Sequence, residues 1–288
     1  MATRRPPLPT FNEAAEASDA VDEAAAAFPA AIRTWCAALD MTPIVTKYQA
    51  WQAQAEVAVE AVSVLAWAYE EYCNYREDAW YDSEHGQAAE ALWQALEAWD
   101  MRSEAAYPLS LYADPTYAWA ILTEDVYAVL PETPALPPAV TVPAPVGMVD
   151  VTRPLPSLDE ARAACAAVDE AWQTFMDAVD AWCMELDVAP LAGAYAIWQA
   201  KVATLTAVVA DLAMEYEQHC ADRSDRWLDS ERGQAVQQVA QELAHCQMDD
   251  DVLDVLRLTA DPAAGWTVTL DNGDEVLPET PELPEEAD

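Results

Sequence analysis

The sequence predicts a mostly α-helical protein, a tandem duplication of one domain with long helices that ends in a small β-hairpin. Ala, the strongest helix former, supplies 60 of the 288 residues. Matching residues recur at one fixed offset of 147 positions, and the end of each copy changes from helical to alternating periodicity. Large aliphatic residues are scarce, so the 12 Trp and 11 Tyr are expected to build much of the core.

The duplication rests on separated matches that need no gap. They include Trp35-Cys36 with Trp182-Cys183, Trp51-Gln52-Ala53 with Trp198-Gln199-Ala200, and Leu130–Pro134 with Leu277–Pro281. We therefore predict a first repeat over 5–140 and a second over 152–288, with the same fold. A Pro/Val-rich linker over 141–151 joins them.

Each copy is expected to begin with long helices. In the first copy, apolar spacing predicts a helix from Asn12 to Leu39 and a second from Ile44, after Pro43, to at least Trp80. The stripe of residues shared by both copies continues through Ser83 and Gln87, which predicts helix from about Ser83 to Met101. That last segment is either a continuation of the second helix or a new helix capped by Asp82 or Ser83.

The end of each copy is expected to form a β-hairpin. In the second copy, the strands would be residues 266–270 and 275–277, joined by a turn at Asn272-Gly273, a dipeptide that favours tight hairpin turns. In the first copy, 119–122 and 126–130 would pair. A lone hairpin is marginal in water, so we expect Trp119 and Trp266 to pack it against the helices.

The net charge excludes several classes of partner. The chain carries 52 Asp and Glu against 13 Lys and Arg, a net charge of −39, which repels nucleic acid phosphates and anionic membrane surfaces. The most apolar stretch, residues 50–69, is interrupted by Glu56 and Glu60, and no apolar run follows Arg4 and Arg5. We expect a cytoplasmic protein with six reduced Cys.

The longest shared motif is the candidate site. It comprises Arg76, Asp78, Trp80, Asp82, Ser83, Glu84, Gly86 and Gln87, which recur as Arg223, Asp225, Trp227, Asp229, Ser230, Glu231, Gly233 and Gln234. The structural interpretation is a helix-crossing motif with an Arg–Trp–carboxylate network, in which the guanidinium covers the indole and the glycine allows close approach. The functional interpretation is a carboxylate site for a divalent cation or for acid–base catalysis. The structural one is favoured, and no cofactor or metal is predicted.

Histidine and cysteine suggest no shared catalytic site. The three His stand at unmatched positions, so a duplicated His-based site is excluded, and Glu215 and His219 are expected to form a surface contact. Cys36 and Cys73 match Cys183 and Cys220 at apolar helical positions, which predicts buried thiols.

These features predict a non-enzymatic, highly acidic binding protein whose partner is a basic protein surface. One such protein is a DNA mimic that inhibits a nucleic-acid-binding protein. Residues 1–147 carry −16 and residues 148–288 carry −23, and only ten of the 22 acids in the first copy are the same residue in the second, which suits a field effect better than one site. Two alternatives stay open: acidity for hydration in a salt-loving host, and a metal-assisted enzyme using the repeated acids.

Overall fold

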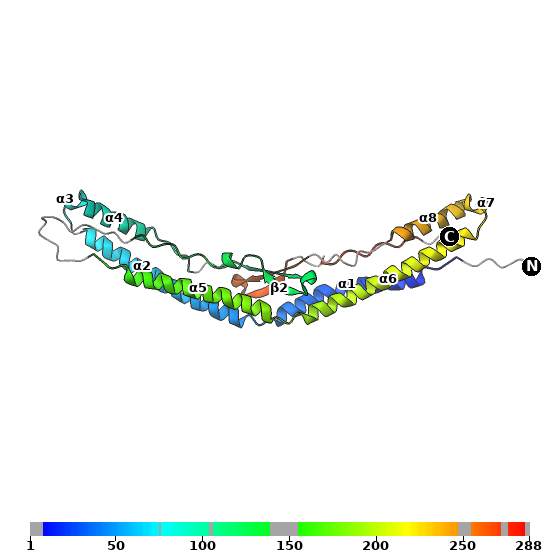
Figure 1. Ribbon diagram of the computed structural model, residues 1–288, viewed down its shortest axis with the longest axis horizontal. Helices are drawn as coiled ribbons and strands as arrows, with labels where there is room; N and C mark the ends of the chain where they lie inside the picture. Colours follow the sequence, from blue (N-terminus) through cyan, green and yellow to red (C-terminus); the bar gives the residue numbers. More distant parts are fainter. Residues whose placement is uncertain are drawn as a thin grey trace, which may run out of the picture.

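The computed structural model describes residues 8–74, 76–103, 106–138, 155–246, 255–271 and 276–285. These residues form a long, arched, mostly helical molecule with one small antiparallel sheet at its centre (Figure 1). The predicted linker over 141–151 lies outside the described residues.

Each α-helix and strand described in the first half has a counterpart 147 residues later. The first half contains α1 (Asn12–Ala38), α2 (Thr42–Asn74), α3 (Asp78–Tyr81), α4 (Glu84–Glu97), β1 (Leu109–Asp114) and β2 (Ala120–Thr123). The second half contains α5 (Asp159–Glu185), α6 (Ala189–Ala221), α7 (Asp225–Leu228), α8 (Glu231–His245), β3 (Leu256–Asp261) and β4 (Thr267–Leu270). The bounds agree to the residue except at the end of α8. Short 3₁₀ turns cover Pro115–Tyr117, Val126–Ala128 and Pro262–Ala264.

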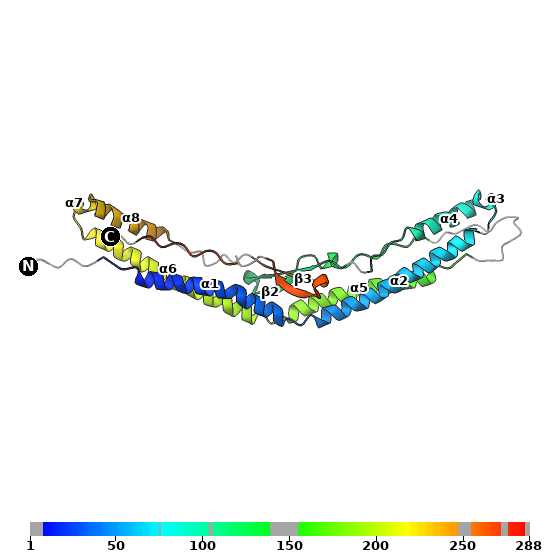
Figure 2. The same ribbon diagram turned by 180° about the vertical axis from the view of Figure 1, so that it is seen from behind.

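The two halves are interlocked. Helix α1 packs against α6 to form one arm of the arch, and α2 packs against α5 to form the other. Each arm therefore contains one long helix from each half. Helix α4 folds back on α2 at one end, and α8 folds back on α6 at the other (Figures 1 and 2). Each half therefore completes its core with helices of the other half.

Reciprocal hydrogen bonds join the halves where the arms meet. The indole Nε1 of Trp35 donates to the carbonyl oxygen of Asp187 at 2.7 Å, and Nε1 of Trp182 donates to that of Asp40 at 2.9 Å. Both acceptors lie in the short junctions between consecutive long helices. Trp35 and its counterpart Trp182 thus hold the two junctions together.

The sheet is shared between the halves, in the order β2-β1-β3-β4. Strands β1 and β3 pair antiparallel, with Leu111 opposite Leu258, its own counterpart. An approximate two-fold axis therefore passes through this residue pair. Since β1 and β3 alternate buried and more exposed residues, one face of the sheet packs on the helices.

Trp119 and Trp266 anchor the sheet to the helices, as expected. Both are buried and occupy left-handed backbone positions in the turns, with φ of 61° and 63°. The Trp119 ring lies 5.4 Å from Tyr195, and the Trp266 ring lies 5.3 Å from Tyr48, centroid to centroid.

The hairpin prediction is wrong in its pairing. Residues 267–270 do form a strand, but its partner is the preceding segment 256–261, and the connection is the 3₁₀ turn begun by Pro262. Asn272-Gly273 falls outside the described residues, and residues 276–277 are not a strand. In the first half, 126–128 is likewise a 3₁₀ turn, and β2 pairs with 109–114.

Two helix expectations need correction. The second helix ends at Asn74, not at Trp80, and a new helix capped by Ser83 follows the short α3. Helix α6 is also more apolar than residues 50–69. By length and composition it could cross a membrane, the single such helix in the described part of the chain, yet in the structure it packs against α1 and α8.

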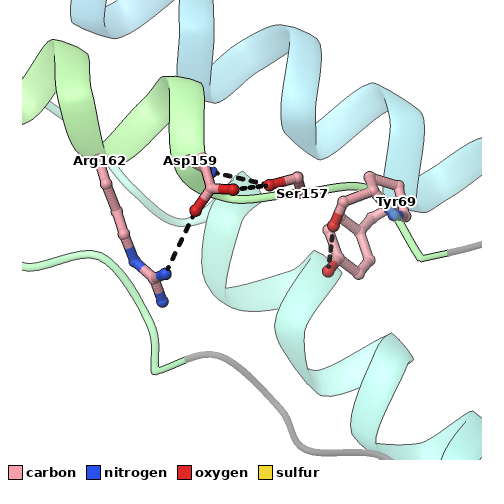
Figure 3. A network of polar contacts seen from close by, with 5 residues as sticks. Tyr69, Ser157, Asp159 and Arg162 are labelled. Atoms are coloured by element: carbon pink, nitrogen blue, oxygen red, sulfur yellow. Dashed lines mark hydrogen bonds and ion pairs between the residues drawn. The ribbon is translucent and has the colours of Figure 1, made fainter.

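The segment before α5 binds the C-terminal part of α2, and the segment before α1 binds the C-terminal part of α6. The hydroxyl of Tyr69 donates to the carbonyl oxygen of Pro156 at 3.0 Å, and Tyr216 makes the matching bond to Pro9 at 3.3 Å. Figure 3 shows Tyr69 beside the start of α5, where the hydroxyl of Ser157 donates to the Asp159 carboxylate at 2.7 Å. These bonds fix where α5 starts along α2.

Candidate functional site

The shared motif forms the two ends of the arch. After α2 ends, α3 and α4 reverse the chain direction, and Ser83 caps α4. The Ser83 hydroxyl accepts from the amide of Gly86 at 3.1 Å and donates to the carbonyl oxygen of Trp80 at 2.5 Å. Ser230 makes the same two bonds, to Gly233 and Trp227, at the other end.

Glycine is required three residues after each capping serine, at Gly86 and at Gly233. A Cβ on Gly86 would lie 2.1 Å from the carbonyl oxygen of Trp80, and one on Gly233 would lie 2.1 Å from that of Trp227. Backbone atoms cannot approach a side-chain carbon that closely, so a side chain at either position would push α4 or α8 away from the preceding turn.

The arginines of the motif cover aromatic rings. The Arg76 guanidinium carbon lies 4.5 Å from the centre of the Tyr72 ring and 5.6 Å from that of Trp80. Its counterpart Arg223 lies 5.1 Å from the Trp227 ring. These distances are within the range of cation–π attraction.

The carboxylates of the motif are not gathered into a site. Asp78, Asp82 and Glu84 are exposed, as are their counterparts Asp225, Asp229 and Glu231 and the amides Gln87 and Gln234. Within the described residues, no group of three or more His, Cys, Asp or Glu is arranged to hold a metal ion. The Arg, Trp, Ser and Gly of the motif thus have structural contacts, and its acids face solvent.

The two ends differ at one buried contact. At the first end, the Tyr72 hydroxyl lies 2.9 Å from Nε2 of His85. At the second, His219 and Arg232 replace this pair, and Nε2 of His219 lies 2.6 Å from Nη2 of Arg223. Burial, Arg223 and Arg232 lower the pKa of His219. The expected surface contact of His219 with Glu215 is therefore wrong, because the histidine is buried beside two arginines.

The matched cysteines of the arm junctions are buried and unreactive. Burial raises the pKa of Cys36 to about 11 and that of Cys183 to about 12. A thiol with so high a pKa stays protonated near neutral pH and is a poor nucleophile. Sequence spacing predicted this burial.

The acidic side chains of the described residues lie at the molecular surface. All described Asp and Glu are at least partly exposed, and His219 is the one buried polar or charged side chain among the described residues. Exposed ion pairs include Arg257–Glu124 at 3.6 Å and Arg162–Asp159 at 3.8 Å. With 13 Lys and Arg for 52 acids, one-to-one pairing leaves at least 39 carboxylates without a basic partner.

Comparison with protein-family models, with curated proteins and with solved structures found no match to this chain.

Proposed function

We propose that this protein is a non-enzymatic acidic binding protein that mimics DNA and inhibits a DNA-binding protein by occupying its basic surface. The observation that carries the proposal is an elongated arch that bears its carboxylates on the outside. A fold without this shape would leave the composition open to many explanations.

Length and charge agree with a short duplex. Helices α1 and α2 have 27 and 33 residues and follow one another along the arch, which at 1.5 Å per residue spans about 90 Å. A duplex of that length has roughly 26 base pairs and, at one charge per 1.7 Å, roughly 53 phosphates. The chain has 52 acidic residues and a net charge of −39.

The approximate two-fold symmetry also supports this proposal. We infer that the chain arose by duplication of a unit over 5–140 and 152–288, since its elements recur at the offset of the sequence matches. Many DNA-binding proteins are two-fold dimers that contact two half-sites on duplex DNA. A two-fold acidic arch presents carboxylates to both subunits of such a dimer. We place this interaction in the cytoplasm, where six free thiols would persist.

The test is displacement of DNA. A fluorescent duplex of roughly 26 base pairs is bound to purified DNA-binding proteins, for example IHF, CAP and the histone octamer, and the acidic protein is added at low salt. The proposal expects the duplex to be released from at least one of them. No release from any of them would contradict it.

A folding measurement distinguishes the halophilic alternative. Circular dichroism in dilute buffer and in molar salt reports whether the acidic fold needs salt. A mimic that works at moderate ionic strength is folded in dilute buffer. Unfolding below molar salt would instead support acidity for hydration in a salt-rich host.

A further inference from the structure

One long helix has an apolar outer face within the acidic surface. On α2, Val57 is 53% exposed, Val64 is 57% exposed and Trp67 is 61% exposed. We call these three residues the α2 apolar face. A Trp this exposed is uncommon, because burying its indole is strongly favourable.

Helical geometry places the three residues together. Steps of seven and three residues keep them within one side of the helix, over a length of about 15 Å. The opposite side of α2 holds the buried Trp51, and α2 packs against α5 and α4 through its buried sides. Glu60 lies between Val57 and Val64 on the outer side, and Glu71 lies one turn beyond Trp67, so carboxylates adjoin the apolar face.

The approximate symmetry gives an internal control. The counterparts on α6 are Thr204, Asp211 and Met214, and Met214 alone is both apolar and exposed, at 58%. The two arms have the same backbone design, so the fold does not require an apolar face at this place. The difference separates the arms in what they can bind.

We propose that the α2 apolar face docks a basic protein surface that contains an apolar pocket for Trp67, with Lys or Arg around the pocket. Charge complementarity favours such a partner, since Glu60 lies on this side of α2, four residues before Val64, and the chain as a whole carries −39. A second copy of this chain is disfavoured as the occupant, because it would bring two chains of −39 and the same glutamates together.

This inference rests on the proposed function for the basic character of the partner and adds where the partner is anchored. Dispersed carboxylates attract many basic surfaces and steer their approach. Exposed aromatic residues that enter a pocket account for much of the binding energy in protein interfaces. The arm containing α2 is therefore the tighter half of an otherwise symmetric binding surface.

Two basic peptides test the inference directly. One alternates Arg with Leu, and the other alternates Arg with Ser, so that they differ in apolar contact and match in charge. Affinities are measured at low salt for wild type, Trp67→Ala and Val64→Asp, the last of which introduces the residue found at 211. Met214→Ala is the matched control on the other arm, and circular dichroism checks that each variant is folded.

We expect wild type to bind the Arg/Leu peptide about tenfold more tightly than the Arg/Ser peptide, in line with an interface hot spot. Trp67→Ala and Val64→Asp should lose this preference, and Met214→Ala should keep it. Of the 12 Trp indole N–H signals, the one missing in Trp67→Phe should move most when the Arg/Leu peptide is added.

The outcomes separate the two proposals. Equal affinity for both peptides, or a preference unchanged by Trp67→Ala, would overturn the docking face and leave the acidic surface as a binding surface. If neither peptide binds wild type at low salt, the acidic binding surface is overturned as well.

Discussion

Replacing Gly86 by alanine should destabilise one end of the arch, although alanine is the better helix former. The new Cβ would lie 2.1 Å from the Trp80 carbonyl oxygen, more than 1 Å inside ordinary contact, and the obstacle is backbone. Overpacking of this kind costs about 1–3 kcal/mol. Alanine returns about 0.5–1 kcal/mol through helix propensity. A contact this short belongs in the upper part of the overpacking range, about 2–3 kcal/mol, so the expected net loss is about 1–2.5 kcal/mol.

The chain supplies a matched control. Gly193 lies in α6, and a Cβ there would have nothing within 4 Å, so Gly193→Ala should stabilise by about 0.5–1 kcal/mol. Urea unfolding followed by circular dichroism measures both variants. Gly233→Ala should repeat the loss, and since Gly86 and Gly233 lie at opposite ends of the arch (Figure 1), the two losses should add.

Hydrogen exchange locates the effect. Faster exchange in Gly86→Ala should be confined to residues 76–97, because the Ser83 cap and the packing of α4 on α2 are what the Cβ disturbs. A Gly86→Ala variant as stable as wild type, or a Gly193→Ala variant equally destabilised, would refute the close-approach argument.

Three further predictions concern the junctions and the second end. Trp35→Phe and Trp182→Phe each remove an indole N–H that donates to the junction of the other half. Each should lower the free energy of unfolding, measured by urea titration, by about 1–3 kcal/mol. A loss no larger than that caused by Trp67→Phe, at an exposed position, would contradict this. His219 has a lowered pKa in the folded state, so protonation favours unfolding, and stability of the α6–α8 end should fall as pH drops below about 6.5; His219→Tyr should abolish that loss in hydrogen exchange at pH 5.5 against 7.5. Cys183 has a raised pKa, so stability should fall as pH rises from about 9 towards 12, and a thermal midpoint that is no less sensitive in Cys183→Ala would count against the burial argument.

The sequence anticipated local features whose causes are local. The first helix was expected over 12–39 and is found over Asn12–Ala38, and Pro43 lies in the first turn of α2, as predicted. The need for glycine at 86 and the position of Arg76 over Trp80 were also anticipated, because both depend on residues close in sequence.

The interlocked pairing could not be read from the sequence. The apolar side of α1 could pack equally well against α2 of the same half or against α6 of the other half, since α2 and α6 share the residues that match between the copies. Tertiary features select the second solution: the three-residue junction at 39–41 and the tryptophan bonds across it carry the chain into the other arm.

The hairpin error has a local and a distant cause: the turn that joins the paired strands is at Pro262, and the middle strand β3 also pairs with β1 of the other half. Asn272-Gly273 is a strong local turn signal, but Leu109–Asp114 and Leu256–Asp261 alternate in burial and pair with each other across the two halves. A strand whose main partner is far away in sequence leaves no short-range signature of that pairing. Likewise, Arg232 approaches His219 only because α8 folds back on α6, a tertiary contact that the sequence did not show.

The salt dependence of binding tests the central claim most directly. Affinity for a DNA-binding protein released from duplex in the displacement assay is measured between about 50 and 200 mM salt, in parallel for this protein and for a duplex of roughly 26 base pairs. The account predicts that both affinities fall steeply, by at least about tenfold, and that protein and duplex never occupy the same target together. An affinity that is insensitive to salt, or a complex containing both, would contradict DNA mimicry.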